Sequence, residues 1–598
     1  MLLLLAIAAL GIGFVPILPK NFGWPYRLLV APALGLFVFG ELALLFSFFL
    51  GLFNGVIVAL IVAGILALTI FVKFKPKNDF GEISPVFLAV TAVTTMLLAY
   101  IWLTQTLAAT SVGLKTGGGG MYGDSALHAA YTSRLTTGEF PIQNPLFAGR
   151  ILVYPFANDL LSSTLKIAGL NFNLAFSLPQ ILFLIGFLVL FYQICRKFTS
   201  DIGFVISLLI LFLGWGVGVI FFLNEWGTQG GGFWQFLTKD YTDNAQYNLY
   251  FRNILTGLVL SERSFLPGLF LGLLMFSNFM EYFGPKDRKL LLINGLILGS
   301  LPFWHTHSFI FFSIVSAIFA VWSMRQNFKK AFVDFSSMGL VAVATMVPFL
   351  FLFFTNHQVS QFLHTSLGWQ NGDENILVFW LKNTFLTIPL AILGFWFVKR
   401  DQKIFFIPAF VVFIIANLVI FQPWDWDNIK LLSWSFLFFV ILTGFLLAKL
   451  AQKGLVAKVT AGVIILISIA SGSLSLELQL KNRYVLYDNW DIDLANWAKS
   501  NTNTRDVFIV EPTPVNPISG LAGRLVYIGY PGHLWVHGID YGKREQEVNQ
   551  ILAGNFSQIG NLEVPVKYIV IPVDKYNFEA PQQFKKVYQN QKYLVLLL

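Results

Sequence analysis

The sequence predicts a mostly α membrane protein, a polytopic transmembrane helical bundle of about 14 spans with a small C-terminal extracytoplasmic α/β domain. Hydrophobic residues make up 56% of the 598 residues and charged residues only 12%, with a mean hydropathy of +0.69, which excludes a soluble globular protein. Apolar runs of about 18 to 23 residues, each able to cross a hydrocarbon core of ~30 Å as a helix, recur as far as residue 476. Beyond it Asn, Asp, Lys and Pro return, as expected of a separate domain.

The apolar runs divide the chain into three regions. Residues 1–84 are expected to form an N-terminal transmembrane extension, residues 85–477 the main bundle with a large outer loop at 108–171, and residues 478–598 the extracytoplasmic domain. The first run lacks a basic n-region and a clear cleavage site, so we interpret it as a retained span rather than a signal peptide. The predicted spans are 2–18, 28–50, 52–72, 85–107, 172–194, 202–223, 264–283, 290–303, 307–324, 335–354, 376–398, 404–421, 431–448 and 459–476.

Lysine and arginine fix the predicted orientation, because the cytoplasmic loops of membrane proteins are enriched in them. The C-terminal domain then lies outside the cytoplasmic (inner) membrane, on the same side as the expected active site. Residues 151–170 are apolar enough to suggest another span, but a crossing there would invert every later loop, so we place them along the outer interface as an amphipathic helix. The basic loops hold Lys20 and Arg27; Lys73, Lys75 and Lys77; Arg196 and Lys197; Lys286, Arg288 and Lys289; Arg325, Lys329 and Lys330; Lys399, Arg400 and Lys403; and Lys449, Lys453 and Lys458.

Short sequence patterns predict the local structure at two further places. The spans at 290–303 and 307–324 are expected to form a helical hairpin with His305 at its outer tip. In the C-terminal domain, β-branched runs at 507–510, 525–528, 568–571 and 593–598 alternate with helical stretches at 492–500 and 543–552, which is typical of a small α/β domain.

Cysteine content and charge exclude several functions. Cys195 is the only cysteine, so an internal disulfide is excluded, and without a Cys/His cluster neither a structural zinc site nor an iron–sulfur site is expected. The net charge of +9 follows the membrane topology, so no nucleic-acid partner is expected.

The long outer loop carries the first candidate for chemistry, Asp124. A carboxylate at the mouth of a membrane cavity can act as a base, because partial desolvation raises its pKa toward that of the hydroxyl it activates. The alternative is that Asp124 caps a helix N-terminus. His128 follows one helical turn later and shares its face, although two such residues are too few for a zinc site.

Two further outer segments hold candidate binding residues. The run from Gln422 to Lys430 includes Asp427, Asn428 and Lys430. Lys430 suits a phosphate as a point charge, and Asp427 is placed to hold that lysine or a metal. The alternative is an interfacial belt of aromatic and charged side chains. In the loop at 224–263, Arg252 and Arg263 are candidate phosphate clamps, while its glycines are alternatively a flexible lid. His305 and His307 are expected at the same depth in the membrane as these outer segments and are further candidates for the site. The alternative is that either histidine packs against Trp304 without a functional role.

A motif in the outer loop resembles the GT-C class of membrane glycosyltransferases over roughly residues 85–450. It comprises Gly123-Asp124, His128, Gly138-Glu-Phe-Pro141, Asn144-Pro145, Gly149-Arg150 and Tyr154-Pro155. The resemblance implies a GT-C-like bundle, a polyprenyl-phosphate-linked sugar donor, an extracytoplasmic active site, and an acidic outer-loop residue, here Asp124, as the base for inverting transfer. Two features depart from the class: three spans precede the one that leads into this loop, and Asp124 has no second acid beside it.

Together the residues and the resemblance predict a glycosyltransferase that moves a hexosyl or pentosyl group from a polyprenyl-phosphate donor to a glycan, lipid or protein acceptor in the cell envelope. The alternatives are a lipid or polysaccharide transporter and a noncatalytic envelope scaffold. No cofactor and no metal ligands are assigned, a divalent metal stays open, and membrane lipid is an expected partner. Asp124 is the expected catalytic residue, and the expected substrate-binding residues are His128, Arg150, Tyr154, Arg252, Arg263, His305, His307, Asp427, Asn428 and Lys430.

Overall fold

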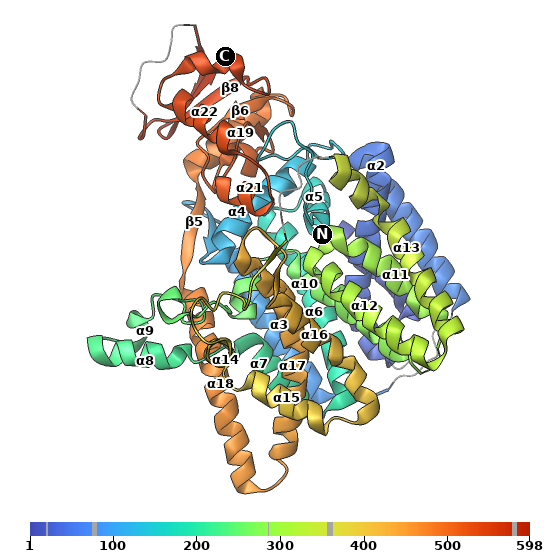
Figure 1. The fold of residues 1–598 in the computed structure, drawn as a ribbon. Coiled ribbons are helices and arrows are strands. Elements are labelled where there is room, and N and C mark those ends of the chain that lie inside the picture. Colours follow the sequence, from blue (N-terminus) through green and yellow to red (C-terminus); the bar gives the residue numbers. More distant parts are fainter. Residues whose placement is uncertain (20–21, 75–80, 285, 356–362, 577–582) are drawn as a thin grey trace.

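A computed structural model describes residues 1–19, 22–74, 81–284, 286–355, 363–576 and 583–598. Figure 1 shows a large helical bundle with a small mixed α/β domain at one end, formed by the last part of the chain. The predicted fold class is therefore confirmed. Lys20, Lys75 and Lys77, which entered the predicted topology, lie outside the described residues.

The bundle contains a helix, or a pair of helices, at each of the predicted spans. Within the described residues eight helices are long and apolar enough to cross a membrane, or ten if each of two bent pairs is one span, so the count of about 14 crossings stays a prediction. The helices are α1 (Leu2–Phe14), α2 (Trp24–Lys73), α3 (Pro85–Gln105), α6 (Phe172–Phe198), α7 (Asp201–Leu213), α8 (Gly218–Gln229), α10 (Phe265–Tyr282), α11 (Arg288–Trp304), α12 (Thr306–Gln326), α13 (Phe328–Thr355), α14 (Ile376–Thr384), α15 (Thr387–Phe397), α16 (Ile407–Ala416), α17 (Ile429–Leu450) and α18 (Leu455–Lys481).

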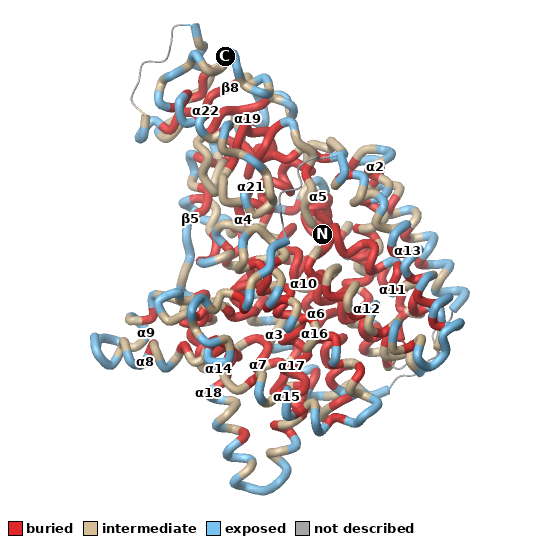
Figure 2. Tube along the Cα trace, in the orientation of Figure 1, coloured by how far each residue is buried: buried red, intermediate tan, exposed pale blue. Residues whose placement is uncertain are grey.

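Burial along these helices identifies the protein as an integral membrane protein. The helices at the centre, α10 and α17, are buried almost throughout, whereas α13 at the edge exposes Leu340, Val347 and Phe351 (Figure 2). A continuous apolar helix face of this kind is stable against lipid but not against water. The two spans predicted at 28–50 and 52–72 join in α2 at Gly51, whose φ of 72° breaks the helical geometry.

The outer loop and the start of the C-terminal region form one structure. Strand β2 (Gly113–Gly117) pairs antiparallel with β1 (Ala108–Thr110) and with β5 (Arg483–Asp488), so segments more than 360 residues apart share a sheet. Helix α4 (Gly120–Leu135) follows β2 and packs against α5 (Ala157–Ile167). The amphipathic helix predicted here is present as α5, but Ala157 to Leu165 are all buried, so it packs within the protein rather than along lipid.

The C-terminal domain has a five-stranded sheet with the order β7-β6-β8-β10-β9. Strand β6 (Val507–Ile509) is parallel to β7 (Leu525–Val526) and β8 (Tyr568–Pro572), while β10 (Tyr593–Leu597) is antiparallel to β8 and β9 (Lys585–Gln589). The helices are α19 (Asn489–Asn501), α20 (Pro517–Gly520), α21 (Pro531–Val536) and α22 (Gly542–Leu552). All four predicted strands and both predicted helices are confirmed.

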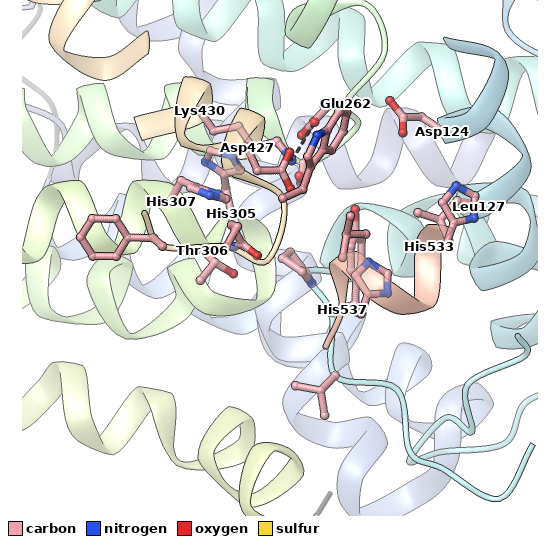
Figure 3. A pocket seen from close by; sticks show the side chains of 18 of the residues that line it. Asp124, Leu127, Glu262, His305, Thr306, His307, Asp427, Lys430, His533 and His537 are labelled. Carbon is pink, nitrogen blue, oxygen red and sulfur yellow. Dashed lines mark ion pairs between the residues drawn. The ribbon is translucent and has the colours of Figure 1, made fainter. Parts of the chain in front are cut away.

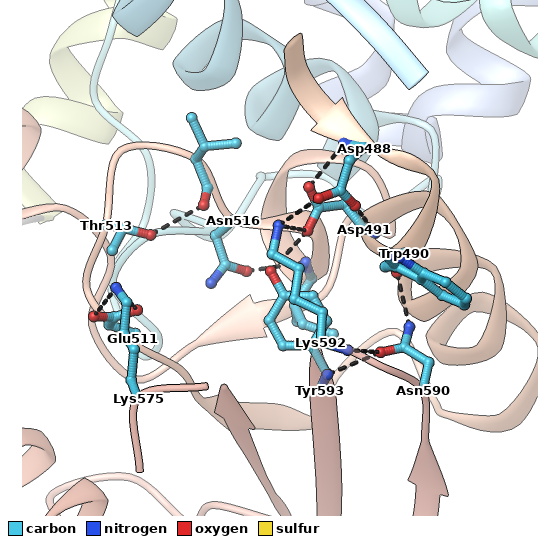
Figure 4. Close-up of polar contacts among 12 residues, drawn as sticks. Asp488, Trp490, Asp491, Glu511, Thr513, Asn516, Lys575, Asn590, Lys592 and Tyr593 are labelled. Atoms are coloured by element: carbon cyan, nitrogen blue, oxygen red, sulfur yellow. Dashed lines mark hydrogen bonds and ion pairs between the residues drawn. The ribbon is translucent and has the colours of Figure 1, made fainter. Parts of the chain in front are cut away.

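Polar contacts hold the sheet of this domain to its first helix. Asp488 and Asp491 form a capping box at the start of α19, and Lys592 lies 2.9 Å and 2.8 Å from their carboxylates (Figure 4). The Tyr593 hydroxyl donates to Asp491 over 2.7 Å. Because Asp488 is also the last residue of β5, these contacts fix the domain to the sheet that continues into the outer loop.

The remaining described elements are short. Helix α8 and helix α9 (Phe233–Phe236) project from the side of the bundle in Figure 1. The others are the 3-10 turns η1 (Val15–Ile17), η2 (Ala245–Tyr247), η4 (Arg400–Phe405), η5 (Asp425–Asn428) and η6 (Phe556–Asn561), the π-helical turn η3 (Leu255–Val259), and the paired strands β3 (His364–Thr365) and β4 (Val419–Ile420).

The predicted orientation has a direct test. We expect a reporter fused after Leu598 to be active when it is alkaline phosphatase, which functions only outside the cytoplasm, and dark when it is a fluorescent protein that matures only inside. The measurement is the activity of both fusions in the same cells. The opposite pattern would invert the topology.

Candidate active site

A cavity of about 660 Å³ lies where the helical bundle meets the C-terminal domain (Figure 3). Its apolar walls include Ile310 of α12, Phe349 and Phe353 of α13, and Leu363. Its polar walls come from α4, the outer loop, the residues before α10, the corner between α11 and α12, the start of α17, and α21. They include Asp124, His128, Tyr154, Glu262, His305, His307, Asp427, Lys430, Tyr530, His533 and His537.

Asp124 lies in the first turns of α4 and faces this cavity (Figure 3). The helix begins at Gly120, after Gly119 with a φ of 59°, so Asp124 is inside the helix and its alternative role as an N-cap is wrong. No hydrogen bond reaches its carboxylate from the described residues. Burial raises the pKa of Asp124, while His128 and then Lys430 oppose the rise. A half-buried carboxylate with free lone pairs can accept a proton from a bound hydroxyl.

Asp159 and Arg263 hold His128 in one tautomer through the Nδ1 side of its ring. Its Nδ1 lies 2.8 Å from Asp159 Oδ2, and the other oxygen of Asp159 accepts a bond of 3.1 Å from Nε of Arg263. All three residues are buried. Because a carboxylate only accepts hydrogen bonds, Nδ1 carries the proton and Nε2 remains an acceptor. Arg263 therefore orients a residue of the cavity and does not line it.

Lys430 is paired with two carboxylates at the cavity wall. Its Nζ lies 2.8 Å from Glu262 Oε1 and 3.0 Å from Asp427 Oδ1 (Figure 3). Glu262 precedes α10, whereas Asp427 and Lys430 lie one turn apart where η5 meets α17. Burial raises the pKa of Glu262, and the ammonium of Lys430 opposes this rise.

Five of the seven histidines of the chain line this cavity. Nδ1 of His305 accepts the backbone N–H of Ser308 over 3.3 Å, which leaves the proton on Nε2. The Nε2 atoms of His305 and His307 are buried without a hydrogen-bond partner in the described structure. Such a group costs about 1 to 3 kcal/mol, so these two atoms point to a ligand that would pair with them.

The C-terminal domain supplies the remaining two histidines. His533 and His537 lie one turn apart on and after α21, on the side of the cavity next to α4 (Figure 3). Burial lowers the pKa of His533 to about 4 and that of His537 to about 3, so both rings are neutral at pH 7. His537 packs on Tyr154 with ring centroids 4.9 Å apart.

Four of the predicted binding residues do not line the cavity: Arg150, Arg252, Arg263 and Asn428. Arg252 lines a second cavity of about 230 Å³ and pairs with Asp240 at 3.6 Å. The side chain of Asn428 is buried and bonds the backbone of Phe421, Ala416 and Val419, so it shapes the loop before α17. The glycines at 230–232 do not line the cavity either, which removes the reason to interpret them as its lid.

The residues that the sequence analysis missed come mainly from the distant domain. Glu262, His533 and His537 are not among the site residues that the sequence predicts. The run Tyr530-Pro531-Gly-His-Leu-Trp-Val-His537 carries a usable signal, because a proline starts a helix and two histidines four positions apart share its face.

Comparison with known proteins adds little to this geometry. No protein-family profile matches the chain, and no curated protein does. Among solved structures, the chain is similar to ArnT from Cupriavidus metallidurans in the apo state, with a TM-score of 0.46 and 10% identity over 86% of this chain and 97% of that chain. A likeness at this level carries no argument about function. Fold and cavity together define a polytopic membrane protein with a polar cavity beneath a C-terminal α/β domain.

No group of three or more His, Cys, Asp or Glu side chains among the described residues is placed to hold a metal ion.

Proposed function

We propose that the protein is a membrane glycosyltransferase that moves a hexosyl or pentosyl group from a polyprenyl phosphate to an extracytoplasmic acceptor, with inversion at the anomeric carbon. The observation that carries the proposal is the half-buried carboxylate of Asp124, which accepts no hydrogen bond from the described residues and faces a cavity with polar and apolar walls. A lipid-linked sugar phosphate needs both kinds of wall, because its chain is apolar and its head is polar. The resemblance of the outer-loop motif to the GT-C class points the same way.

The reaction requires a base, an anion-binding group and a dry site. Asp124 accepts the proton of the acceptor hydroxyl as its oxygen attacks the anomeric carbon, and the bond from that carbon to the phosphate oxygen breaks on the opposite side. The leaving polyprenyl phosphate takes the electron pair of this bond and is stabilised by Lys430 and by the Nε2–H group of His305. Helix α21 lines the cavity and would help to keep water from intercepting the sugar.

The cavity also revises which residues would hold the donor. Arg252 and Arg263 are replaced in this role by Lys430, His305 and His307, since only the latter line the cavity. Asp427 would position Lys430 through their ion pair of 3.0 Å. His128 and Tyr154 lie beside Asp124, where an acceptor hydroxyl would have to sit. The α21 helix would then select the acceptor.

Replacing Lys430 by Ala tests the donor side. The change removes a charge-assisted contact to phosphate worth about 1.5 to 3 kcal/mol, so donor affinity is expected to fall by about one to two powers of ten. Lys430→Arg should recover only part of the loss, because a planar guanidinium does not replace a compact ammonium. The measurement is titration of purified variants with a polyprenyl-phosphate sugar, followed by a transfer assay on envelope acceptors.

The matched control is Lys382→Ala, which removes another Lys–Glu pair of 2.8 Å, to Glu374, outside the cavity. It should leave donor affinity unchanged. If Lys430→Ala binds the donor as tightly as the parent, the donor assignment is wrong. If the parent also fails to transfer sugar, a transporter or a scaffold is the better interpretation.

A further inference from the structure

The described walls of the cavity hold more negative than positive charge. Three carboxylates, Asp124, Glu262 and Asp427, face it, and Lys430 is the one lysine or arginine among the lining residues that the structure describes. His533 and His537 do not correct the imbalance, because their lowered pKa values leave both rings uncharged at pH 7. A phosphate-bearing donor would add at least one further negative charge to this cavity. Binding of the donor must therefore be accompanied by a change that reduces the negative charge of the cavity walls.

Glu262 occupies the position on Lys430 that a phosphate would need. Its Oε1 lies 2.8 Å from Nζ, closer than the 3.0 Å of Asp427, and both carboxylates are largely buried. Asp427 is tied to Lys430 by helical spacing, as residues i and i+3. Glu262 instead reaches Lys430 from another element, the segment before α10, so it is the partner that can yield its place to a ligand (Figure 3).

We propose that the Glu262 carboxylate is a placeholder for the donor phosphate, and that donor binding at Lys430 is accompanied by uptake of one proton on Glu262. The inference rests on the proposed function. The proton comes from solvent and converts the Glu262 carboxylate to a carboxylic acid. Lys430 then pairs with phosphate and Asp427, and the protonated Glu262 becomes a hydrogen-bond donor to the same phosphate.

The surroundings of Glu262 favour this protonation. The other titratable groups that line the cavity are Asp427 of η5, Lys430 of α17, Asp124 and His128 of α4, Tyr154 of the outer loop, His305 and His307 of the α11–α12 corner, and Tyr530, His533 and His537 on and beside α21. Burial raises the pKa of Glu262 to about 7, and Asp124 and Asp427 add to the rise against the effect of Lys430. A bound phosphate would raise it further, because it is one more anion beside the carboxylate and competes for its ammonium partner.

The test uses farnesyl phosphate, a short polyprenyl monophosphate, with the full-length protein in detergent. Above about pH 7.5 the probe is fully ionised, because its second pKa is about 6. Calorimetric titrations are then made at pH 8 in buffers of different ionisation enthalpy. The dependence of the apparent binding enthalpy on the ionisation enthalpy of the buffer gives the number of protons taken up. We expect close to one proton for the parent, and an affinity that falls roughly tenfold for each pH unit above the pKa of Glu262.

Glu262→Gln imitates the protonated side chain, so we expect no proton uptake, no tenfold slope, and tighter binding than the parent at pH 8. Glu374→Gln, which alters an equivalent pair with Lys382 outside the cavity, should behave as the parent. Equal proton uptake by Glu262→Gln and the parent would overturn the inference. An affinity of the parent that does not change with pH would also overturn it, and this measurement does not depend on whether a variant folds. Failure of the proposed function would be seen differently, as no binding of the probe at any pH.

Discussion

Asp124→Asn is expected to reduce sugar transfer by about 10² to 10⁴ in kcat while leaving donor affinity unchanged. Asparagine keeps the shape of the side chain but has no basic oxygen, so the acceptor hydroxyl keeps its proton as the bond to the sugar forms. Donor affinity should survive because the proposed contact to phosphate is made by Lys430 and not by Asp124. The measurement is single-turnover transfer from a polyprenyl-phosphate sugar, with donor affinity titrated separately.

The pH dependence of transfer adds a second criterion. A base must be deprotonated, and burial raises the pKa of Asp124, so transfer at saturating donor should rise with pH through that pKa and then level off. The residual activity of Asp124→Asn should not show this rise of the transfer rate with pH. Asp373→Asn, an exposed carboxylate outside the cavity, is the control and should match the parent. Transfer by Asp124→Asn at the parental rate would remove Asp124 from the mechanism.

The fold was largely predictable because its signals are local. Apolar runs of membrane length need no long-range information, and neither does the alternation of β-branched and helical segments that located β6, β8 and β10. Helix α4 shows the limit of such signals. A Gly-Asp step resembles an N-cap, but the positive φ of Gly119 starts the helix four residues before Asp124.

The candidate site was only partly predictable, because its selection depends on tertiary packing. Arg263 and Lys430 look alike in the sequence, since each is a basic residue beside an apolar helix. Only the fold places Asp159 against Arg263, at a separation of 104 residues, and leaves Lys430 facing the cavity. His533 and His537 belong to a domain whose contact with α4 no local pattern reports.

The ion pair between Asp159 and Arg263 leads to the largest expected effect on stability. Arg263→Ala should lower the free energy of unfolding by about 3 to 5 kcal/mol, because Asp159 would keep its buried charge without its strongest partner. Arg263 also donates to the carbonyl of Phe176 over 3.2 Å and to the hydroxyl of Ser162, and these contacts are lost as well. The measurement is denaturant unfolding of the purified protein in a fixed detergent.

Two comparisons separate a buried pair from an exposed one and from simple loss of volume. Arg505→Ala removes a pair of 2.8 Å with Glu139 in which the arginine side chain is 80% exposed, and it should leave the unfolding curve nearly unchanged. In the double variant Asp159→Leu with Arg263→Met, neither charge remains buried, so much of the lost stability should return. His128 would lose the acceptor that fixes its tautomer in that variant, so transfer should stay impaired even where stability recovers. Equal destabilisation by Arg263→Ala and Arg505→Ala would show that burial of the pair does not set its contribution.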